Sequence, residues 1–125
     1  MADVQPRTKF WVEHDGRIVL SDYRARLLRL IDETGSLADA ASALGLSYRR
    51  AWGKLREIEA NLGERLVESA AGGPGGGGSR LTDSGRRYLL RYEAFRRRAE
   101  LAVAQEFLRA FGPGGPPPRP GAPGP

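Results

Sequence analysis

The sequence predicts a mainly α-helical domain with small β-hairpins, and three observations support this fold class. Two short amphipathic segments meet at Gly45. Apolar residues alternate on both sides of Asp15-Gly16, a dipeptide typical of tight hairpin turns. A long apolar stripe with helical spacing begins after Thr82 and reaches Phe111. With 125 residues, the chain is long enough for one domain with a modest core.

The N-terminal part predicts a hairpin followed by a helix. Residues 9–14 and 17–20 are expected to pair across the Asp15-Gly16 turn. The expected cross-strand neighbours are Val12 with Val19 and Trp11 with Leu20. Ser21 then has a side chain suited to an N-cap, and Gly35 is expected to end the helix. The apolar stripe of this helix is expected to comprise Tyr23, Leu27, Leu30 and Ile31.

Residues 37–62 predict a helix-turn-helix. Ser36 and Ser47 are each placed to cap a helix, and Gly45 can leave the first helix through a positive φ angle. The stripe on the first helix, where small residues allow close approach, comprises Leu37, Ala40, Ala41 and Leu44. The inner side of the second helix is expected to be Tyr48, Ala51, Trp52, Leu55, Ile58 and Leu62. Its outer side is expected to be Arg49, Arg50, Gly53 and Lys54.

Positive charge at the start of the second helix favours a DNA-binding function. Cations there oppose the helix macrodipole, and Arg50 and Lys54 form a like-charge i, i+4 pair. A sequence chosen only for helix stability would place acidic residues such as Glu57 first. A recognition helix has this arrangement because its first turns enter the major groove beside phosphates and guanine edges. The alternative interpretation is a polar face exposed to solvent.

Residues 65–81 predict a wing after this helix. Two short strands, 65–69 and 79–81, flank the glycine-rich segment 70–78, which is expected to be a mobile loop. Glycine amides can approach a phosphate backbone or a minor groove closely, and Arg80 would add charge there. A surface turn without function is an equally open interpretation. A nucleotide-binding P-loop is excluded, because neither a Lys-Ser/Thr pair nor a helix directly follows the glycines.

The last predicted helix, 82–111, is longer than a domain of this size can cover. Its residues, at 1.5 Å each, span about 45 Å. A second copy of the helix would cover the remainder, and a two-fold dimer would place two recognition helices about one DNA turn apart. The predicted organisation is a flexible segment 1–8, a winged helix-turn-helix domain 9–111 that includes this dimerisation helix, and a disordered Pro/Gly tail 112–125.

Composition limits the classes of function. The net charge of +5 and the pI of about 10.2 suit an anionic partner such as double-stranded DNA. Without cysteine and with His14 as the single histidine, neither thiol chemistry nor a soft-metal site is predicted, and no cofactor. An enzyme is disfavoured, because His14 lies in a predicted hairpin turn without a Ser/Asp arrangement nearby. The sequence has no apolar run of membrane-spanning length and no signal peptide, so a cytoplasmic protein is expected.

Three segments together resemble one family: TGSLADAASALGLSYRRAW, LVESAAGGPGGGGSRLTDSG and RRYLLRYEAF. They resemble the N-terminal DNA-binding domain of ModE-type molybdate-responsive regulators, a winged-helix group related to LysR-type regulators. The resemblance implies a homodimer that binds an operator and represses molybdate-uptake genes. The DNA contacts that it implies are Ser47, Tyr48, Arg49, Arg50 and Lys54 on the recognition helix, with Gly75, Gly76, Gly77, Ser79 and Arg80 in the wing. The implied dimer contacts, on the first and last helices, are Tyr23, Leu27, Tyr88, Tyr92, Phe95, Ala99 and Val103.

The C-terminal residues depart from the family pattern. ModE-type regulators usually carry C-terminal segments that bind the oxyanion, and this sequence has prolines and glycines there. The expectation is DNA binding without a molybdate sensor in this polypeptide, with a separate molybdate-sensing partner as one source of control. The alternative expectation is a protein-interaction module that pairs with a full-length regulator and modulates it without reading DNA. That alternative leaves Arg49, Arg50 and Lys54 unexplained.

Overall fold

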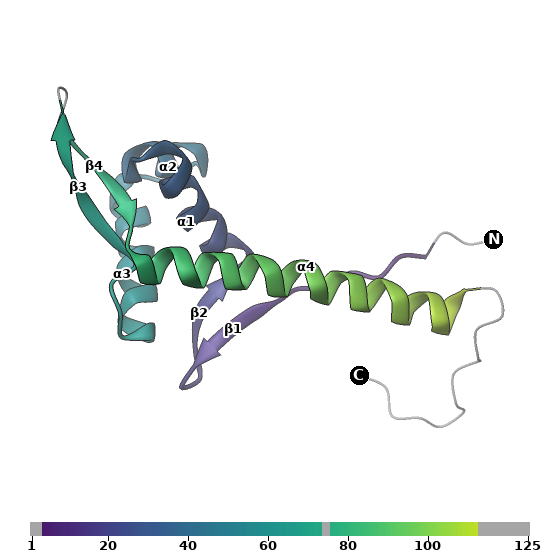
Figure 1. The fold of residues 1–125 in the computed structure, drawn as a ribbon. Helices are drawn as coiled ribbons and strands as arrows, with labels where there is room; N and C mark the ends of the chain where they lie inside the picture. The colour runs from purple at the N-terminus through teal and green to yellow at the C-terminus, as the bar shows by residue number, and fades with distance from the viewer. Residues whose placement is uncertain (1–3, 74–75, 113–125) are drawn as a thin grey trace. The chain divides into compact units, whose positions relative to one another are not determined.

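The computed structural model describes residues 4–73 and 76–112, and it has the predicted mainly α-helical architecture with two hairpins (Figure 1). In chain order the elements are β1 (Trp11–His14), β2 (Arg17–Ser21), α1 (Asp22–Thr34), α2 (Leu37–Ala43), α3 (Tyr48–Leu62), β3 (Val67–Gly73), β4 (Gly76–Leu81) and α4 (Asp83–Phe111). The predicted flexible residues 1–3 and the predicted tail residues 113–125 lie outside the described residues.

The chain divides into two units, and the helix-turn-helix belongs to the larger one. This unit, Phe10–Glu93, contains every element from β1 to β4 and the first part of α4. The second unit combines Met1–Lys9 with Ala94–Pro125 and contains the remainder of α4. The boundary between the two units therefore falls within the last helix.

Serine caps begin the first three helices where the sequence predicts them. The hydroxyls of Ser21, Ser36 and Ser47 accept hydrogen bonds from the backbone N–H groups three residues later, at 3.2, 3.0 and 3.2 Å. Gly45 has a φ angle of +68°, which turns the chain between α2 and α3. The predicted helix-turn-helix is therefore confirmed.

The N-terminal hairpin follows the predicted register only next to its turn. The observed pairs are His14 with Arg17, Glu13 with Ile18, Val12 with Leu20 and Trp11 with Ser21. The predicted pairs of Val12 with Val19 and Trp11 with Leu20 are wrong, because a β-bulge beyond Glu13 shifts the register. Strict alternation would bury only one of two successive residues, whereas the bulged strand buries both Val19 and Leu20.

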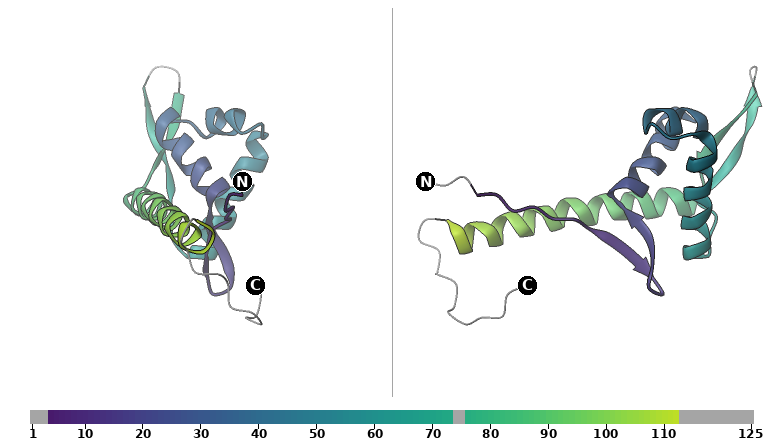
Figure 2. Two further views of the ribbon diagram at one scale, coloured as in Figure 1. Left: turned by 90° about the vertical axis from the view of Figure 1, so that its right-hand side faces the viewer. Right: turned by 180° about the vertical axis from the view of Figure 1, so that it is seen from behind.

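The β3–β4 hairpin is longer than the sequence predicts. Its strands continue into the glycine-rich segment, where the pairs are Ala70 with Gly78 and Gly73 with Gly76. The prediction of a loop over 70–78 is therefore wrong for the described part of that segment, because backbone hydrogen bonds can pair strands without side chains. The N–H of Ser79 donates to the carbonyl of Gly35 at 2.9 Å, which holds β4 beside α1 (Figure 2).

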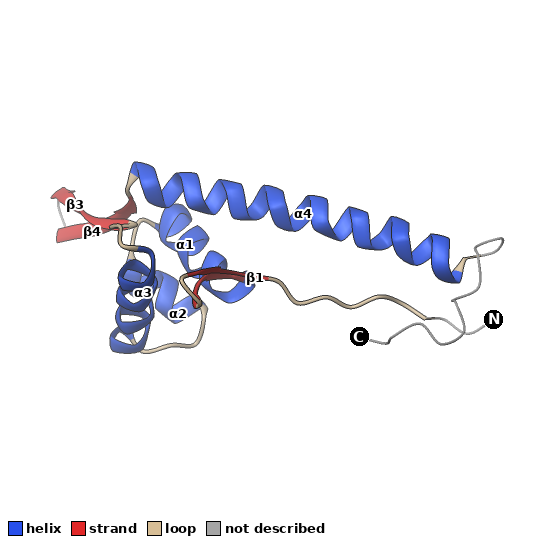
Figure 3. Ribbon diagram, turned by 90° about the horizontal axis from the view of Figure 1, so that it is seen from below, coloured by secondary structure: helices blue, strands red, loops and turns tan. Residues whose placement is uncertain are grey.

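The core of the Phe10–Glu93 unit lies where α1, α2 and α3 meet, and the two hairpins form separate sheets (Figure 3). The largest fully buried side chains are Leu27, Leu28, Ile31, Ile58, Leu66 and Leu89. On α2 the buried residues include Ala40 and Ala41, whose small side chains allow both neighbouring helices to approach closely. This packing fixes the orientation of α3, the predicted recognition helix.

Helix α4 begins with a single side-chain cap, as predicted. The Thr82 hydroxyl accepts a hydrogen bond from the N–H of Gly85 at 3.0 Å. A Cβ atom at Gly85 would lie 3.0 Å from the carbonyl carbon of Leu66 and closer still to its oxygen. The glutamate of a capping box therefore cannot occupy this position, which explains why the cap has no second partner.

Ion pairs join α1 to the first part of α4. Arg29 donates through Nε to Glu93 at 3.0 Å, and this bond raises the pKa of the Arg29 guanidinium. Asp32 lies within 3.4 Å of Arg29 and within 3.2 Å of Arg86. Because these side chains are only partly buried, their contribution to folding is smaller than that of the core.

The part of α4 that lies in the second unit exposes apolar side chains. The large exposed ones are Phe95, Leu101, Leu108 and Phe111. The rings of Phe107 and Phe111 stack at 4.7 Å between centroids. Exposed apolar residues of this size on one helix are typical of an interaction surface.

Candidate nucleic-acid interface

Helix α3 presents its cations outward and packs its aliphatic residues inward. Ala51, Leu55 and Ile58 are buried, whereas Arg49 and Arg50 are exposed. In the described part of the chain no carboxylate forms an ion pair with either arginine. The first two turns of α3 therefore present positive charge that is not neutralised within the chain.

Tyr48 and Trp52 were predicted to face inward, and this prediction is wrong. Their exposed fractions are 57% and 46%. At 100° per residue, Trp52 lies at the edge of the stripe defined by Ala51 and Leu55, and Tyr48 lies in the first turn, beyond the core. The guanidinium of Arg56 lies 4.9 Å from the centre of the Trp52 ring. The outer surface of α3 is therefore both cationic and aromatic.

Because Trp52 is half exposed, we expect Trp52→Ala to lower the free energy of unfolding by only about 1 kcal/mol, the average effect of a substitution. Loss of a large core aromatic would cost about 3 to 5 kcal/mol. Urea unfolding of the purified variant measures the difference. Leu55→Ala, on the buried side of the same helix, is the matched control and should cost about 2 to 5 kcal/mol. A larger loss for Trp52→Ala than for Leu55→Ala would contradict the observed facing of α3.

Lys54, the third cation of α3, is half-buried and contacts α1. Its Nζ atom lies 5.2 Å from the centre of the Tyr23 ring, a cation–π contact. Ser47, at the start of the helix, is exposed, but its hydroxyl already accepts the capping hydrogen bond. The five predicted contact residues of α3 thus lie at one end of the helix, with Lys54 the least accessible of the cations.

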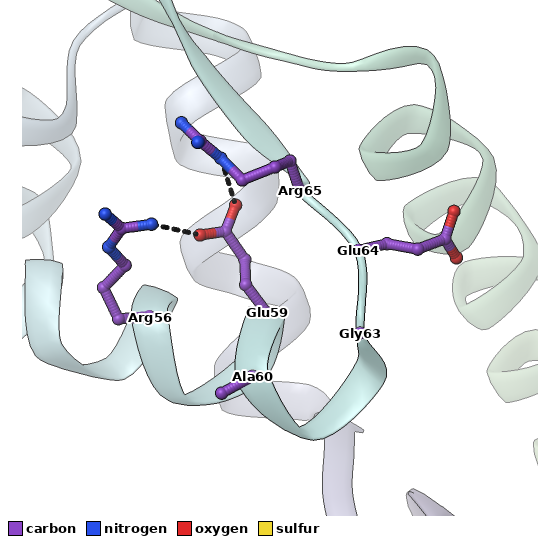
Figure 4. Close-up of a pocket in the computed structure, with 6 residues that line it drawn as sticks. All are labelled: Arg56, Glu59, Ala60, Gly63, Glu64 and Arg65. Carbon is purple, nitrogen blue, oxygen red and sulfur yellow. Dashed lines mark ion pairs between the residues drawn. The ribbon is translucent and has the colours of Figure 1, made fainter.

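Glu59 joins α3 to the start of the β3–β4 hairpin. Its carboxylate is buried and accepts hydrogen bonds from the N–H groups of Leu66 and Val67, at 2.7 and 3.2 Å. Arg56 and Arg65 also lie near it, at 3.5 and 3.8 Å (Figure 4). Sequence reasoning missed this residue, although Glu59 follows Leu55 by one turn and therefore continues the inner stripe.

Glu64, which follows this helix, turns toward α4 instead (Figure 4). Its carboxylate accepts hydrogen bonds from the Ser84 and Tyr88 hydroxyls, both at 3.0 Å. The bond from Tyr88 raises the pKa of that phenol. The start of α4 is therefore held next to the end of α3 by polar contacts.

The predicted wing residues lie on β4, except for Gly75, which is outside the described residues. Gly76 and Gly77 begin the strand, and the N–H of Ser79 is already used by Gly35. The Arg80 side chain is exposed and forms an ion pair with Glu68 across the hairpin, at 3.0 Å. The positive charge of Arg80 is therefore partly compensated by Glu68, unlike that of Arg49 and Arg50 on α3.

Two of the predicted dimer contacts are not available at the surface. Leu27 and Tyr92 are 0% and 4% exposed, so both belong to the core of the Phe10–Glu93 unit. The Tyr92 hydroxyl donates to Asp22 at 2.6 Å. The prediction is therefore wrong for these two residues, because their helices pack on each other within one chain. The others are at least partly exposed: Tyr23, Tyr88, Phe95, Ala99 and Val103.

Two further classes of site can be checked in the structure. Among residues 4–73 and 76–112, no group of three His, Cys, Asp or Glu side chains could hold a metal ion. The described helices include none that is both long and apolar enough to cross a membrane.

His14 lies exposed in the hairpin, where its Nδ1 atom is 2.9 Å from the carbonyl of Asn61. This contact ties the hairpin to the end of α3.

Residues 24–86 of the chain match the lysR family of bacterial regulatory helix-turn-helix proteins. The chain belongs to this family. The match runs from α1 to the start of α4, so the lysR-family region includes α3 and the β3–β4 hairpin. Because the family is one of regulatory proteins, the prediction that this chain is not an enzyme is confirmed.

Curated relatives of this lysR-family chain include several named ModE, as the sequence resemblance predicts. The chain is 42% identical over 83 residues to the molybdenum transport protein ModE of Azotobacter vinelandii, covering 66% of this chain and 31% of that protein. It is 40% identical over 70 residues to the DNA-binding transcriptional dual regulator ModE of Escherichia coli K12, covering 56% and 27%. The chain thus spans less than a third of the length of these relatives.

Solved structures show the same fold. The structure of full-length CbnR complexed with its target DNA matches with a TM-score of 0.53 at 22% identity, covering 68% of this chain and 28% of that chain. The complex of the BenM DNA-binding domain with benA site 1 DNA matches with a TM-score of 0.52 at 19% identity, covering 71% and 94%. The winged helix-turn-helix architecture predicted from the sequence is therefore confirmed.

Proposed function

We propose that this chain binds double-stranded DNA sequence-specifically in transcription regulation, with the N-terminal end of α3 in the major groove. The observation that supports this most is the exposed pair Arg49 and Arg50, which no carboxylate of the described residues neutralises. Two cations in a first helical turn oppose the macrodipole and so lower helix stability. A polyanionic ligand would bind these two cations, and its phosphates would neutralise their charge.

Each predicted contact residue has a role in this proposal. Arg49 and Arg50 read base edges, since guanidinium groups pair bidentately with guanine. Ser47 and Tyr48, at the start of the helix, are near enough to contact phosphates or bases. Lys54 and Arg80 bind phosphates, and the glycine-rich strands of the wing approach the backbone with their amides. The wing glycines proposed for this role are Gly75, Gly76 and Gly77, whereas the N–H of Ser79 already donates to Gly35.

Fluorescence anisotropy with a labelled duplex of random sequence tests DNA binding directly. We expect affinity to fall steeply as salt rises, with a log–log slope of about −0.9 per phosphate contacted. If no binding occurs at low salt, the proposal fails. Retained binding to a full-length ModE-type regulator in that case would favour the alternative function, an interaction module that modulates a regulator without reading DNA.

Single substitutions should separate base readout from phosphate binding. We expect Arg49→Ala or Arg50→Ala to cost about 1 to 3 kcal/mol of binding free energy and to relax preference at one base position. Lys54→Ala or Arg80→Ala should weaken binding to all sequences alike and reduce the salt slope by about one. Anisotropy titrations on selected and random duplexes measure both effects. Arg109→Ala, an exposed arginine paired with Glu106, is the control that should change neither.

Gly53, in the middle of the outer face of α3, gives a prediction in which stability and binding change in opposite directions. Nothing lies within 4 Å of a Cβ built there, and glycine in a helix interior costs about 1 kcal/mol relative to alanine. We expect Gly53→Ala to raise the melting temperature, yet to weaken DNA binding, because the methyl group would separate the helix from the groove. Thermal melting and anisotropy on the same sample measure the two effects. Tighter DNA binding by Gly53→Ala would contradict the placement of α3.

We further infer that two copies of the chain associate through α4. The exposed apolar side chains of its C-terminal part support this, and the remaining candidate contacts are Tyr23, Tyr88, Phe95, Ala99 and Val103. Sedimentation equilibrium on the full chain should give a dimer, and Val103→Asp should give a monomer. The matched control is Ala104→Asp, which introduces the same charge at an exposed neighbouring position. A monomeric wild-type chain at micromolar concentration would contradict the inference.

The names of the relatives support a link to molybdenum. One is called a molybdenum transport protein. The name of another, a DNA-binding transcriptional dual regulator, supports the regulatory role only. We propose that the genes bound by this chain serve molybdenum uptake or use, with molybdate sensed by a separate partner. Sequencing of DNA recovered with the tagged chain from its own cells tests the link, and bound sites with no connection to molybdenum genes would refute it.

A further inference from the structure

Trp52 is a large apolar side chain that remains about half exposed on α3, where nothing in the core requires it. Its exposed fraction is 46%, whereas the aliphatic residues Ala51 and Leu55 beside it are buried. Tyr48, one turn earlier and therefore on the same side, is 57% exposed. Together Tyr48 and Trp52 form an apolar strip along the outer edge of the helix.

The strip is surrounded by cations. The Arg56 guanidinium lies 4.9 Å from the Trp52 ring centre and 3.5 Å from the Glu59 carboxylate. Contacts with both residues therefore position Arg56 beside the strip. Arg49 precedes Trp52 by three residues and thus lies on a neighbouring part of the same face. An apolar strip bordered by arginines would suit a ligand with anionic groups along its edges and single apolar groups between them.

Double-stranded DNA has this character in the major groove. Phosphates line both sides of the groove, and the 5-methyl group of thymine is the apolar feature among the base edges. We propose that Trp52, together with Tyr48, contacts thymine 5-methyl groups and thereby contributes to sequence preference. This inference rests on the proposed function, since it assumes that α3 enters the major groove.

The proposal predicts a specific chemical dependence. Removing one methyl group from the DNA should weaken binding of the wild-type chain about fourfold, the effect of burying one such group. The same removal should have no effect on a Trp52→Ala chain, which has no indole to contact the methyl group. Coupling between one protein side chain and one DNA methyl group is thus the signature of this contact.

The experiment begins with duplexes selected from a random library by the wild-type chain. Each thymine in a selected duplex is replaced singly by deoxyuridine, which lacks only the 5-methyl group, and anisotropy measures the affinity of the wild-type, Trp52→Ala and Trp11→Ala chains. Trp11, on β1, is the matched control because it is 50% exposed and its Nε1 atom donates to Glu13 at 2.8 Å. Thermal melting establishes that each variant is folded.

We expect at least one thymine whose replacement weakens the wild-type and Trp11→Ala chains about fourfold and leaves the Trp52→Ala chain unchanged. Equal losses in wild type and Trp52→Ala, no loss in any chain, or selected duplexes without thymine would each overturn the proposal while DNA binding itself stands. If no duplex is selected and random DNA does not bind, it is instead the proposed function that fails.

Discussion

Gly85→Ala is expected to destabilise the Phe10–Glu93 unit by at least about 3 kcal/mol, the upper end of the cost of overpacking. The added methyl group would overlap the carbonyl group of Leu66, which is backbone and cannot rotate away as a side chain could. Either the start of α4 or the residues before β3 must then move, and the hydrogen bond from Gly85 to Thr82 would be strained as well. Urea unfolding measures the loss.

The matched control for this prediction is the glycine-to-alanine change at Gly53. That substitution should stabilise the chain, because the helix surface there is open. The two variants should therefore shift the melting temperature in opposite directions, with Gly85→Ala lowering it by roughly 12 °C or more in a domain of this size. Similar melting temperatures for Gly85→Ala and the wild type would show that α4 does not pack against Leu66 as described.

Glu59→Ala is expected to cost about 3 kcal/mol of unfolding free energy, since it leaves two buried N–H groups without an acceptor. Those groups belong to Leu66 and Val67, where the chain enters the wing hairpin. The loss should also weaken DNA binding by more than destabilisation explains, because the wing would no longer be held against α3. Urea unfolding and anisotropy at a temperature where the variant is folded separate the two effects.

Glu57→Ala is the control on the same helix. Glu57 is exposed and pairs with Arg24 at 3.3 Å, and exposed ion pairs contribute at most about 1 kcal/mol. Glu59→Gln adds a second comparison, because its amide oxygen can still accept both hydrogen bonds, which end on one carboxylate oxygen, whereas the negative charge beside Arg56 and Arg65 is lost. We expect its loss to fall between those of the other two variants. Equal stability of Glu59→Ala and Glu57→Ala would contradict the role of the buried carboxylate.

Sequence reasoning succeeded where local rules decide the structure. Ser21, Ser36 and Ser47 cap helices because a hydroxyl can satisfy the free N–H groups of a first turn in any tertiary context. Gly45 turns the chain because the left-handed conformation is open to it. The aliphatic residues of α3 face inward because three or four residues complete a helical turn. These local rules are sufficient to predict the helix-turn-helix and most of its outer face.

Sequence reasoning failed where contacts between distant segments decide the structure. Helical periodicity predicts that Trp52 lies on the inner side of α3, and only the positions of the neighbouring elements show that the core ends before it. The roles of Glu59 and Gly85 likewise depend on Leu66, which no local pattern connects to them. In the N-terminal hairpin, burial of both Val19 and Leu20 required a bulge that hairpin rules do not specify.

The hydrogen bond from Ser79 to Gly35 has a geometric consequence for any ligand. It ties β4 to the residue just before the α2 cap, while Glu59 ties α3 to the other strand of the same hairpin. Both strands of the hairpin are therefore attached to the helical core, and we expect the spacing between α3 and the wing to change little on binding. One base pair inserted between the DNA segment that contacts α3 and the segment that contacts the wing would rotate one segment by about 35° relative to the other. We expect that α3 and the wing could then no longer contact both segments at once.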